Sequence, residues 1–253
     1  MLSKNKIKLI TSLSHKKYRD ENGLFVAEST KLVLDLMPEM ECVLLVATAD
    51  WLKINAESVK ADELIETTEN ELHKISSQKT PQGVLALFRK PNYTYNDEIS
   101  TQLSLALDNV QDPGNLGTII RIADWFGVRD IFCSLHSADA FGAKTVQATM
   151  GALARVRVHY VNLTEFLQKC SERKLPVYGT FMNGEDIYKE KTLSENGIIL
   201  MGNEGNGISA EIEKYVSKRL LIPNFPQGET TSESLNVGIA TALVCAEFRR
   251  RCR

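Results

Sequence analysis

The stretch IPNFPQGETTSESLNVGIATALV, residues 222–244, joins a loop rich in Pro, Gly, Ser and Thr to a strongly apolar helical pattern. Its apolar residues, with those that follow, fall at helical spacing in two stripes: Leu235, Ile239, Ala242 and Ala246 in one, and Val237, Ala240, Val244 and Phe248 in the other. A helix that is apolar around most of its girth needs cover on more than one side. The sequence therefore predicts a buried C-terminal helix, from Ser234 onward, that is entered through a polar loop.

Short apolar runs and amphipathic segments alternate along the chain before this stretch. The apolar runs predict strands at residues 103–109, 130–134, 156–160, 176–180, 197–202 and 218–223. The amphipathic segments predict helices at residues 114–127, 144–153, 163–173 and 209–216. Strands separated by helices of this length indicate an α/β fold with a mostly parallel sheet that is covered on both faces.

The polar stretch RKPNYTYNDEISTQ, residues 89–102, has neither a helical nor a strand period and is typical of a linker. Before it, the patterns predict a helix at residues 27–37, a strand at 42–47, a short helix at 68–76 after a threonine cap, and a strand at 83–88. We therefore expect a small α/β domain at residues 1–92 and a larger domain at residues 101–253.

The overall charge gives no reason to expect nucleic acid, because the 253 residues carry a formal net charge of −2. Local basic patches exist at both ends of the chain. Residues 1–19 contain no acid but carry six cations: Lys4, Lys6, Lys8, Lys16, Lys17 and Arg19. The chain closes on a second group, Arg249, Arg250, Arg251 and Arg253. Each patch is either a solvated charged face or an RNA contact.

Several classes of protein and site are disfavoured. The five cysteines are scattered without a CxxC pair, so a zinc site and a disulfide framework are not expected. No apolar run has the length of a membrane span, and the first residues lack a secretory signal. We expect a cytoplasmic protein without membrane or metal, with a lysine-rich mitochondrial transit segment as the alternative reading of residues 1–19.

The informative loops follow the apolar runs, where ligands bind in parallel sheets. They are VQDPGNLGTIIR, GNEGNGIS and NFPQGETTSESLN. Gly202, Gly205 and Gly207 give GxxGxG, the reverse of the dinucleotide fingerprint, and this argues against a nucleotide-dependent oxidoreductase. There is no P-loop, HExxH or GxSxG, and the four histidines sit apart in the sequence.

Taken together and in this order, the loops resemble the SpoU (TrmH-like) family of RNA ribose 2′-O-methyltransferases, in the SPOUT superfamily. The matching segments are residues 107–128, 200–209 and 222–244, and the resemblance extends over residues 103–253. The first part is similar to the small RNA-binding domain that many members carry, with KKYRDENGLFVAES and TPQGVLALFRK as its marks. Ser29 stands where that domain is expected to have glycine.

The resemblance implies a C-terminal deep trefoil knot, S-adenosylmethionine as methyl donor, and a ribose 2′-hydroxyl of ribosomal or transfer RNA as acceptor. It also implies a homodimer formed through the C-terminal helix, and symmetric dimers are the commonest oligomers. The alternative for that helix is the core of a monomer. The alternative for the function is a catalytically idle RNA-binding protein on the same fold.

The resemblance assigns cofactor contact to Gly202, Ile222 and Leu235, the last two of which could equally be core residues. It assigns the catalytic constellation to five residues: Asn115, Arg121, Glu204, Ser234 and Asn236. Without a catalytic role, Asn115 and Ser234 read as helix caps, and Arg121 reads as a surface residue on the first turns of its helix. The family role of Arg121 is a general base, but a guanidinium stays protonated and only donates. We therefore expect Arg121 to act mainly as a phosphate clamp.

One departure from the family pattern lies between Ile222 and Leu235, which are further apart than is usual in the third segment. The lengthened loop, Asn224–Ser232, contains Glu229 and is followed by Glu233, which are unfavourable beside an RNA phosphate. We expect this loop to project over the active site or to serve a different substrate.

Overall fold

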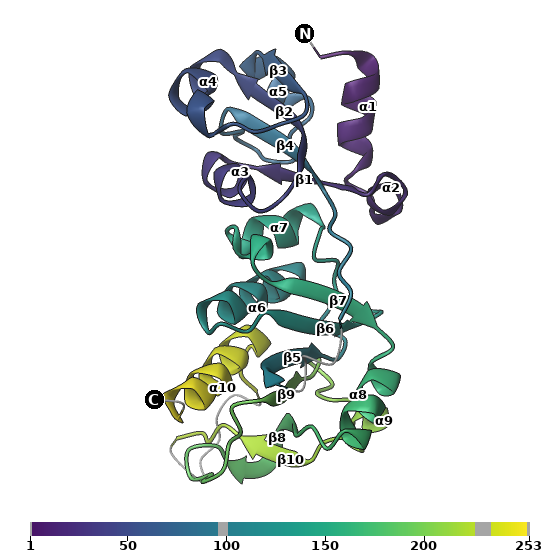
Figure 1. The fold of residues 1–253 in the computed structure, drawn as a ribbon, viewed down its shortest axis with the longest axis vertical. Helices are drawn as coiled ribbons and strands as arrows, with labels where there is room; N and C mark the ends of the chain where they lie inside the picture. The colour runs from purple at the N-terminus through teal and green to yellow at the C-terminus, as the bar shows by residue number, and fades with distance from the viewer. Residues whose placement is uncertain (1, 96–100, 226–233, 252–253) are drawn as a thin grey trace. The chain divides into compact units, whose positions relative to one another are not determined.

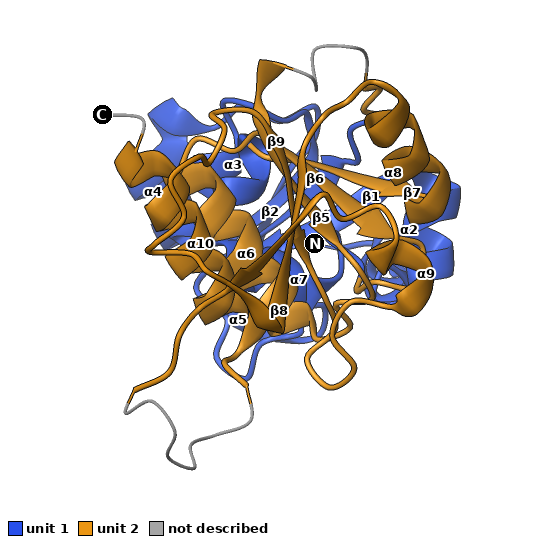
Figure 2. Ribbon diagram, turned by 90° about the horizontal axis from the view of Figure 1, so that it is seen from below, with its two compact units in different colours: residues 1–92, 139–155 blue, residues 93–138, 156–253 orange. Residues whose placement is uncertain are grey.

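The computed structural model of the chain describes residues 2–95, 101–225 and 234–251. The chain forms two compact units, which Figure 2 distinguishes by colour. Unit 1 consists of Met1–Asn92 and Asp139–Arg155, and unit 2 consists of Tyr93–Ala138 and Val156–Arg253. Segment 139–155 therefore packs with the N-terminal unit although it lies within the predicted catalytic sequence. Within the described residues, no helix is long and apolar enough to cross a membrane.

Unit 1 is built on a four-stranded sheet of order β1-β4-β2-β3 (Figure 1). Its strands are β1 (Leu24–Glu28), β2 (Cys42–Thr48), β3 (Leu64–Thr67) and β4 (Val84–Arg89). β4 runs antiparallel to β1 and β2, whereas β3 is parallel to β2. The core on one face combines Leu44, Val46, Leu85 and Leu87 of the central strands with Ile10 of the first helix. Burying side chains of this size contributes roughly 1.5–3 kcal/mol each.

Eight helical segments belong to unit 1 within the described residues. They are α1 (Lys4–Ser12), α2 (Lys16–Asn22), α3 (Thr30–Leu36), α4 (Ala49–Asn55), η1 (Ala56–Ser58), α5 (Glu69–His73) and α7 (Ala143–Thr149), with the short turn η3 (Ala152–Ala154) after α7. The sequence patterns did not assign α1, α2, β1, α4, η1 or β3. α1 and α2 are short and polar, so tertiary contacts decide them more than periodicity does.

Unit 2 is built on a six-stranded sheet of order β10-β8-β9-β5-β6-β7, in which every pairing is parallel. Its strands are β5 (Leu103–Leu107), β6 (Asp130–Ser134), β7 (Arg157–Val161), β8 (Val177–Asp186), β9 (Gly197–Met201) and β10 (Lys218–Leu221). This confirms the expected mostly parallel sheet in an α/β fold.

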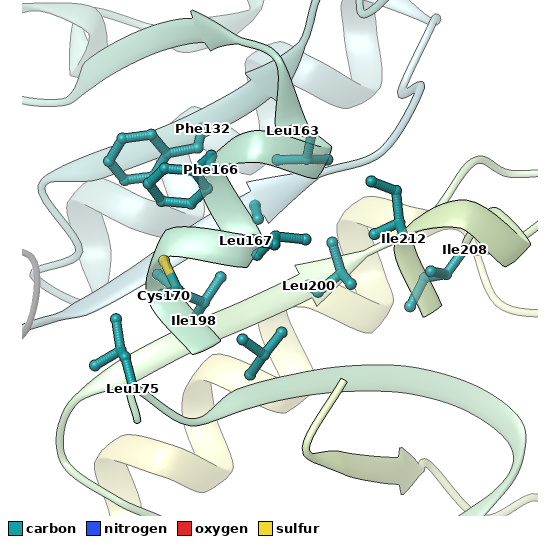
Figure 3. Packing of buried hydrophobic residues seen from close by; sticks show 12 residues of the cluster. Phe132, Leu163, Phe166, Leu167, Cys170, Leu175, Ile198, Leu200, Ile208 and Ile212 are labelled. Carbon is teal, nitrogen blue, oxygen red and sulfur yellow. The ribbon is translucent and has the colours of Figure 1, made fainter. Parts of the chain in front are cut away.

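The two faces of this sheet are covered by different helices, as Figures 1 and 2 show. α8 (Leu163–Glu172) and α9 (Ala210–Glu213) cover one face, where Phe166 stacks on Phe132 at 4.1 Å between ring centroids (Figure 3). α6 (Pro113–Trp125) and α10 (Val237–Arg251) pack together on the other face. Covering both faces explains why β5, β6 and β9 are buried along their whole length.

Some expected boundaries were wrong. The helix expected from residue 27 begins at Thr30, because Ala27 and Glu28 pair with β4. The helix expected over 144–153 is interrupted at Met150, whose φ of 51° ends α7. The helix expected from Ser234 begins at Val237. The strand expected over 176–180 continues to Asp186.

The basic N-terminal segment is less available to a ligand than its sequence indicates. Arg19 is buried, where it pairs with Asp139 at 2.7 Å and donates to the carbonyl oxygens of Leu13 and Ser14. Lys6 pairs with Glu63, and Lys17 lies 3.8 Å from Glu21. A buried guanidinium requires such partners because an unpaired buried charge is costly. Arg19 is therefore a structural residue of unit 1.

Two tyrosines in the expected linker make ordered aromatic contacts. Tyr95 lies edge-on to Phe132 at 5.2 Å and to Phe166 at 5.9 Å between ring centroids, and Tyr93 lies against His159. Residues 96–100, in the middle of the expected linker, lie outside the described residues. Tyr93 and Tyr95 thus pack within unit 2, to which they belong.

Ser29 occupies a backbone conformation that favours glycine, with φ 94° and ψ 143°. This geometry gives the physical reason for expecting glycine at that position. Strain of this kind costs about 1–3 kcal/mol, whereas glycine's extra freedom in the unfolded chain costs about 0.5–1 kcal/mol.

We therefore expect Ser29→Gly to raise the free energy of unfolding by roughly 1 kcal/mol, measured by urea denaturation. Ser29→Ala is the matched control, because alanine keeps the Cβ and the strain. Equal stabilisation by both substitutions would show that the backbone conformation is not the cause.

Candidate active site

The three polar loops leave the same edge of the unit 2 sheet, where the parallel strands β5, β9 and β10 have their carboxyl ends. β5 and β9 are paired, with Leu107 opposite Met201. Asp108 continues that pairing by donating its backbone N–H to the carbonyl oxygen of Met201 at 2.9 Å. The loop after β5 and the loop after β9 therefore start side by side.

A chain of side-chain hydrogen bonds joins one residue from each loop. Asn115 Nδ2 donates to Glu204 Oε1 at 2.8 Å. Asn236 Nδ2 donates to Asn115 Oδ1 at 2.9 Å. Three of the five residues expected to form the catalytic constellation are thus in direct contact.

The same chain continues into the backbone of α10. Asn236 Oδ1 accepts hydrogen bonds from the N–H groups of Gly238 at 2.9 Å and Ile239 at 3.3 Å. Because a carboxylate accepts and never donates, Glu204 fixes which end of each amide faces its neighbour. Asn236 is the residue that caps α10, whereas Ser234 is exposed and lies before the helix.

The cap of α6 also differs from the expectation. Asp112 is the N-cap, and its carboxylate accepts from the backbone N–H of Asn115 at 2.8 Å. Asn115 is the third helical residue, so the helix-cap reading of Asn115 was wrong. Its side chain is consequently available for Glu204 and Asn236.

The loop after β9 is a tight hairpin closed by paired hydrogen bonds between Asn203 and Gly207, at 2.9 and 3.0 Å. Asn203 Oδ1 accepts from the N–H groups of Gly205 and Asn206, and its Nδ2 donates to the carbonyl oxygen of Asn109 at 2.8 Å. A Cβ at Gly202 would overlap the backbone of Gly207 and Ile208. The base of the hairpin therefore has room only for glycine.

Two positioning residues were missed by sequence reasoning. The buried carboxylate of Asp108 accepts from the backbone N–H of Ser209 at 2.8 Å and so ties the loop after β5 to the end of the hairpin. Asn203 does the same from the other side. Both stand inside the matching segments, and Asn203 lies between Gly202 and Glu204, so the signal was their position in those segments.

The candidate cofactor residues lie at the same sheet edge. Gly202 directly follows β9, and the half-buried Ile222 directly follows β10. Leu235 precedes Asn236 and is 47 % exposed. Ile222 and Leu235 flank residues 226–233, which include most of the lengthened loop with Glu229 and Glu233 and lie outside the described residues. Tight backbone at Gly202 and exposed apolar side chains suit an adenine ring with its attached chain.

Arg121 is exposed on α6, in the third turn of the helix and not in its first turns. Within the described part of the chain, its guanidinium has no hydrogen-bond or ion-pair partner. The helix presents Thr118, Arg121 and Trp125 on one exposed stripe, since residues three and four apart share a face. The structure therefore does not join Arg121 to the Asn115–Glu204–Asn236 chain.

Other reactive groups are committed to structure. His159 is buried and hydrogen-bonded to Asp130 at 2.8 Å. Burial raises the pKa of Cys245 to about 12 and the pKa of Cys133 well above its ordinary value, so neither is a thiolate at neutral pH. Across residues 2–95, 101–225 and 234–251, no cluster of three His, Cys, Asp or Glu side chains could hold a metal ion.

Comparison with known proteins gives a consistent result. Residues 102–246 match the model of the SpoU rRNA Methylase family, and residues 4–86 match the MRM3-like substrate binding domain. The chain is 29% identical over 245 residues to 23S rRNA (guanosine(2553)-2'-O)-methyltransferase RlmP of Bacillus subtilis, covering 96% of each chain.

Solved structures are similar over the whole chain. A TrmH-family protein from Porphyromonas gingivalis is 41% identical, with a TM-score of 0.88 and 99% of both chains covered. An AdoMet-bound rRNA methyltransferase from Sinorhizobium meliloti is 29% identical, with a TM-score of 0.85, covering 100% of this chain and 97% of that one.

The hairpin geometry generates a test of the candidate cofactor site. We expect Gly202→Ala to lower the affinity for S-adenosylmethionine at least tenfold in calorimetry, since the added Cβ must displace the Gly207 backbone. Gly205→Ala is the matched control, because the nearest atom to a Cβ there is 3.6 Å away. Equal affinities for the two variants would remove Gly202 from the site.

Proposed function

The chain belongs to the SpoU rRNA methylase family, and from that membership we propose how its own residues carry out the reaction of the family. The protein is an RNA methyltransferase that transfers a methyl group from S-adenosylmethionine to a ribose 2′-hydroxyl. The observation that carries the assignment of residues is the hydrogen-bonded chain Glu204–Asn115–Asn236 at the carboxyl edge of the parallel sheet.

The cofactor supplies an electrophilic methyl group on a sulfonium that leaves readily. We assign its binding to Gly202, Ile222 and Leu235. Gly202 lets the hairpin backbone close tightly at this point, since a Cβ there would meet the backbone of Gly207 and Ile208, and Ile222 and Leu235 offer apolar walls. Positioning of this kind can supply effective molarities of ~10⁵ M or more, so little covalent assistance is required.

Hydrogen bonds among Glu204, Asn115 and Asn236 hold their three loops in one arrangement beside the residues assigned to the cofactor. Because Glu204 only accepts hydrogen bonds, the NH₂ group and the oxygen of the Asn115 and Asn236 side chains each have a defined position. We assign contact with the ribose or its phosphate to Ser234, which is exposed and lies two residues before Asn236. We propose that these residues orient the acceptor hydroxyl: its oxygen bonds to the methyl carbon, the carbon–sulfur bond breaks with its electron pair going to sulfur, and the hydroxyl proton passes to solvent water.

Arg121 acts as the clamp on the phosphate beside the target ribose. A guanidinium offers donors only, and a nearby phosphate anion favours its charged form. The exposed position without an acidic partner in the described chain leaves its charge available for RNA. Such a clamp also stabilises negative charge as it develops on the attacking oxygen.

Residues 1–92 form the part of the chain that recruits RNA. Support comes from the match of residues 4–86 to a substrate binding domain and from exposed lysines, among them Lys4 and Lys8, in the acid-free N-terminal segment. The similarity to RlmP, whose name gives 23S rRNA as substrate, favours ribosomal RNA over transfer RNA. A ribosomal RNA substrate also favours a cytoplasmic location.

The catalytic unit works as a homodimer. Along α10 and the residue before its cap, Leu235, Ile239 and Leu243 are exposed at a spacing of four, and Trp125 at the end of α6 is 85 % exposed. α6 and α10 pack closely, with Gly238 against Thr118. Apolar stripes of this kind on neighbouring helices are typical of an interface.

The path of the chain through this unit forms the trefoil knot of the SPOUT fold. The support is that the residues after β10 return to α6, where Asn236 contacts Asn115 and α10 packs along α6. This contact holds the chain after β10 against the chain after β5 at the carboxyl edge of the sheet.

We expect the purified protein to transfer labelled methyl groups from S-adenosylmethionine to a ribose 2′ oxygen of 23S ribosomal RNA. The modified position should resist alkaline cleavage, because the 2′-hydroxyl is the nucleophile in that reaction. Label on a base atom would contradict the ribose assignment. RNA binding without any methyl transfer would favour the catalytically idle alternative.

For Arg121, we expect Arg121→Ala to lower the single-turnover rate by roughly 10²–10³-fold and Arg121→Lys by less than roughly tenfold, because lysine keeps the charge. Both variants should bind S-adenosylmethionine like the parent. A new ionisation near the lysine pKa in Arg121→Lys, with near-normal rates above it, would identify a general base and overturn the clamp.

For the dimer, we expect sedimentation equilibrium to give two chains per particle and Ile239→Asp with Leu243→Asp to give one. Placing two carboxylates in an apolar interface desolvates them without partners. The control is Ile54→Asp, because Ile54 lies on α4 in unit 1 and is 82 % exposed. This variant should remain dimeric. A monomeric parent would contradict the proposal.

A further inference from the structure

The most buried carboxylate of unit 1 is used to order a loop. Glu28 is 6 % exposed at the end of β1. One of its oxygens accepts from Ser77 N at 2.9 Å and Ser77 Oγ at 2.6 Å, and the other accepts from Ser76 Oγ. Burying a carboxylate is costly unless several donors satisfy it. Three donors from two adjacent residues fix the loop backbone at this point.

Further contacts hold the same loop on both sides of Ser77. Ile75 is buried in the core, and Gln78 N donates to Ser76 Oγ at 3.0 Å. Gln78 Nε2 donates to Gln147 Oε1 of α7 at 3.2 Å, within unit 1. We give the name serine loop to residues 73–82, HKISSQKTPQ, which comprise the last residue of α5 and the loop after it.

The serine loop is basic and free of acid. No Asp or Glu occurs in the sequence between Glu71 and Asp97. His73, Lys74 and Lys79 are all exposed. Neither lysine has an acidic partner among the residues that the structure describes.

Several other lysines of unit 1 are neutralised by acids, whereas, within the described chain, Lys74 and Lys79 are not. The pairs are Lys6 with Glu63, Lys31 with Asp35, Lys53 with Asp50, and Lys90 with Asp20. A rigid loop that carries unpaired cations is suited to a polyanion, because little order is lost when it binds.

We propose that the serine loop is a contact surface for the RNA phosphate backbone, with Lys74 and Lys79 as the phosphate contacts and Glu28 as the residue that positions them. The inference rests on the proposed function, since it assigns a place to RNA recruitment by residues 1–92. Phosphate contacts from lysines, hydroxyls and backbone N–H groups position a protein on nucleic acid without reading its sequence.

The test is filter binding of protein-free 23S ribosomal RNA to the full chain over a range of KCl concentrations. We expect Lys74→Ala with Lys79→Ala to weaken binding roughly tenfold and to lower the slope of log affinity against log salt by roughly 1.5, as counterion release predicts for two lost phosphate contacts. Lys60→Ala with Lys169→Ala removes two exposed lysines that have no acidic partner in the described chain, one after η1 and one on α8, and is the matched control.

The outcomes separate this inference from the proposed function. If the parent protein methylates the RNA but the Lys74 and Lys79 double variant keeps the parental affinity and salt slope, the inference fails and the function stands. If the parent neither binds nor methylates the RNA, the proposed function fails, and the inference that rests on it fails with it. Melting temperature is expected to be unchanged, since both side chains are exposed.

Glu28 is tested separately through loop order. Glu28→Gln should accelerate amide exchange at Ser77 and Gln78 and weaken RNA binding severalfold, because an amide cannot accept from every donor that faces it. The affinity for S-adenosylmethionine should not change. Faster exchange with unchanged RNA affinity would show that loop order is irrelevant to binding.

Discussion

The arrangement of the catalytic unit depends on one carboxylate, that of Glu204. Because it only accepts hydrogen bonds, it forces Asn115 to present its NH₂ on one side and its oxygen on the other. The Asn115 oxygen then orients the Asn236 amide, whose own oxygen caps α10. Glu204, in the loop after β9, therefore determines through Asn115 of α6 how the Asn236 amide is oriented at the first turn of α10.

The sequence predicted the fold of unit 2 well because its signals are local. Apolar runs followed by Gly, Asn and Ser marked both the strands and the edge where ligands bind. The resemblance to the SpoU family assigned Asn115, Glu204 and Asn236 to the site, although Asn115 and Asn236 are 121 positions apart. Their contact could be expected only because parallel strands bring their carboxyl ends to one edge.

What the sequence could not predict depends on contacts between distant residues. Arg19 looked like part of a basic patch, but its partner Asp139 is 120 positions away. Asp139 belongs to the segment that packs with unit 1 from within the sequence of the larger domain. The cap of α6 was misplaced for a different reason: Asp112 and Asn115 are both good caps, and only the geometry of the turn distinguishes them.

The order of synthesis has a consequence for the site. Asn236 and α10 follow every other residue of the site in the sequence, and domains generally fold as units from the N-terminal side during synthesis. The residues after β10 can reach Asn115 only after they have themselves been synthesised. A nascent chain can therefore fold unit 1 and still lack a complete catalytic centre until Asn236 has left the ribosome.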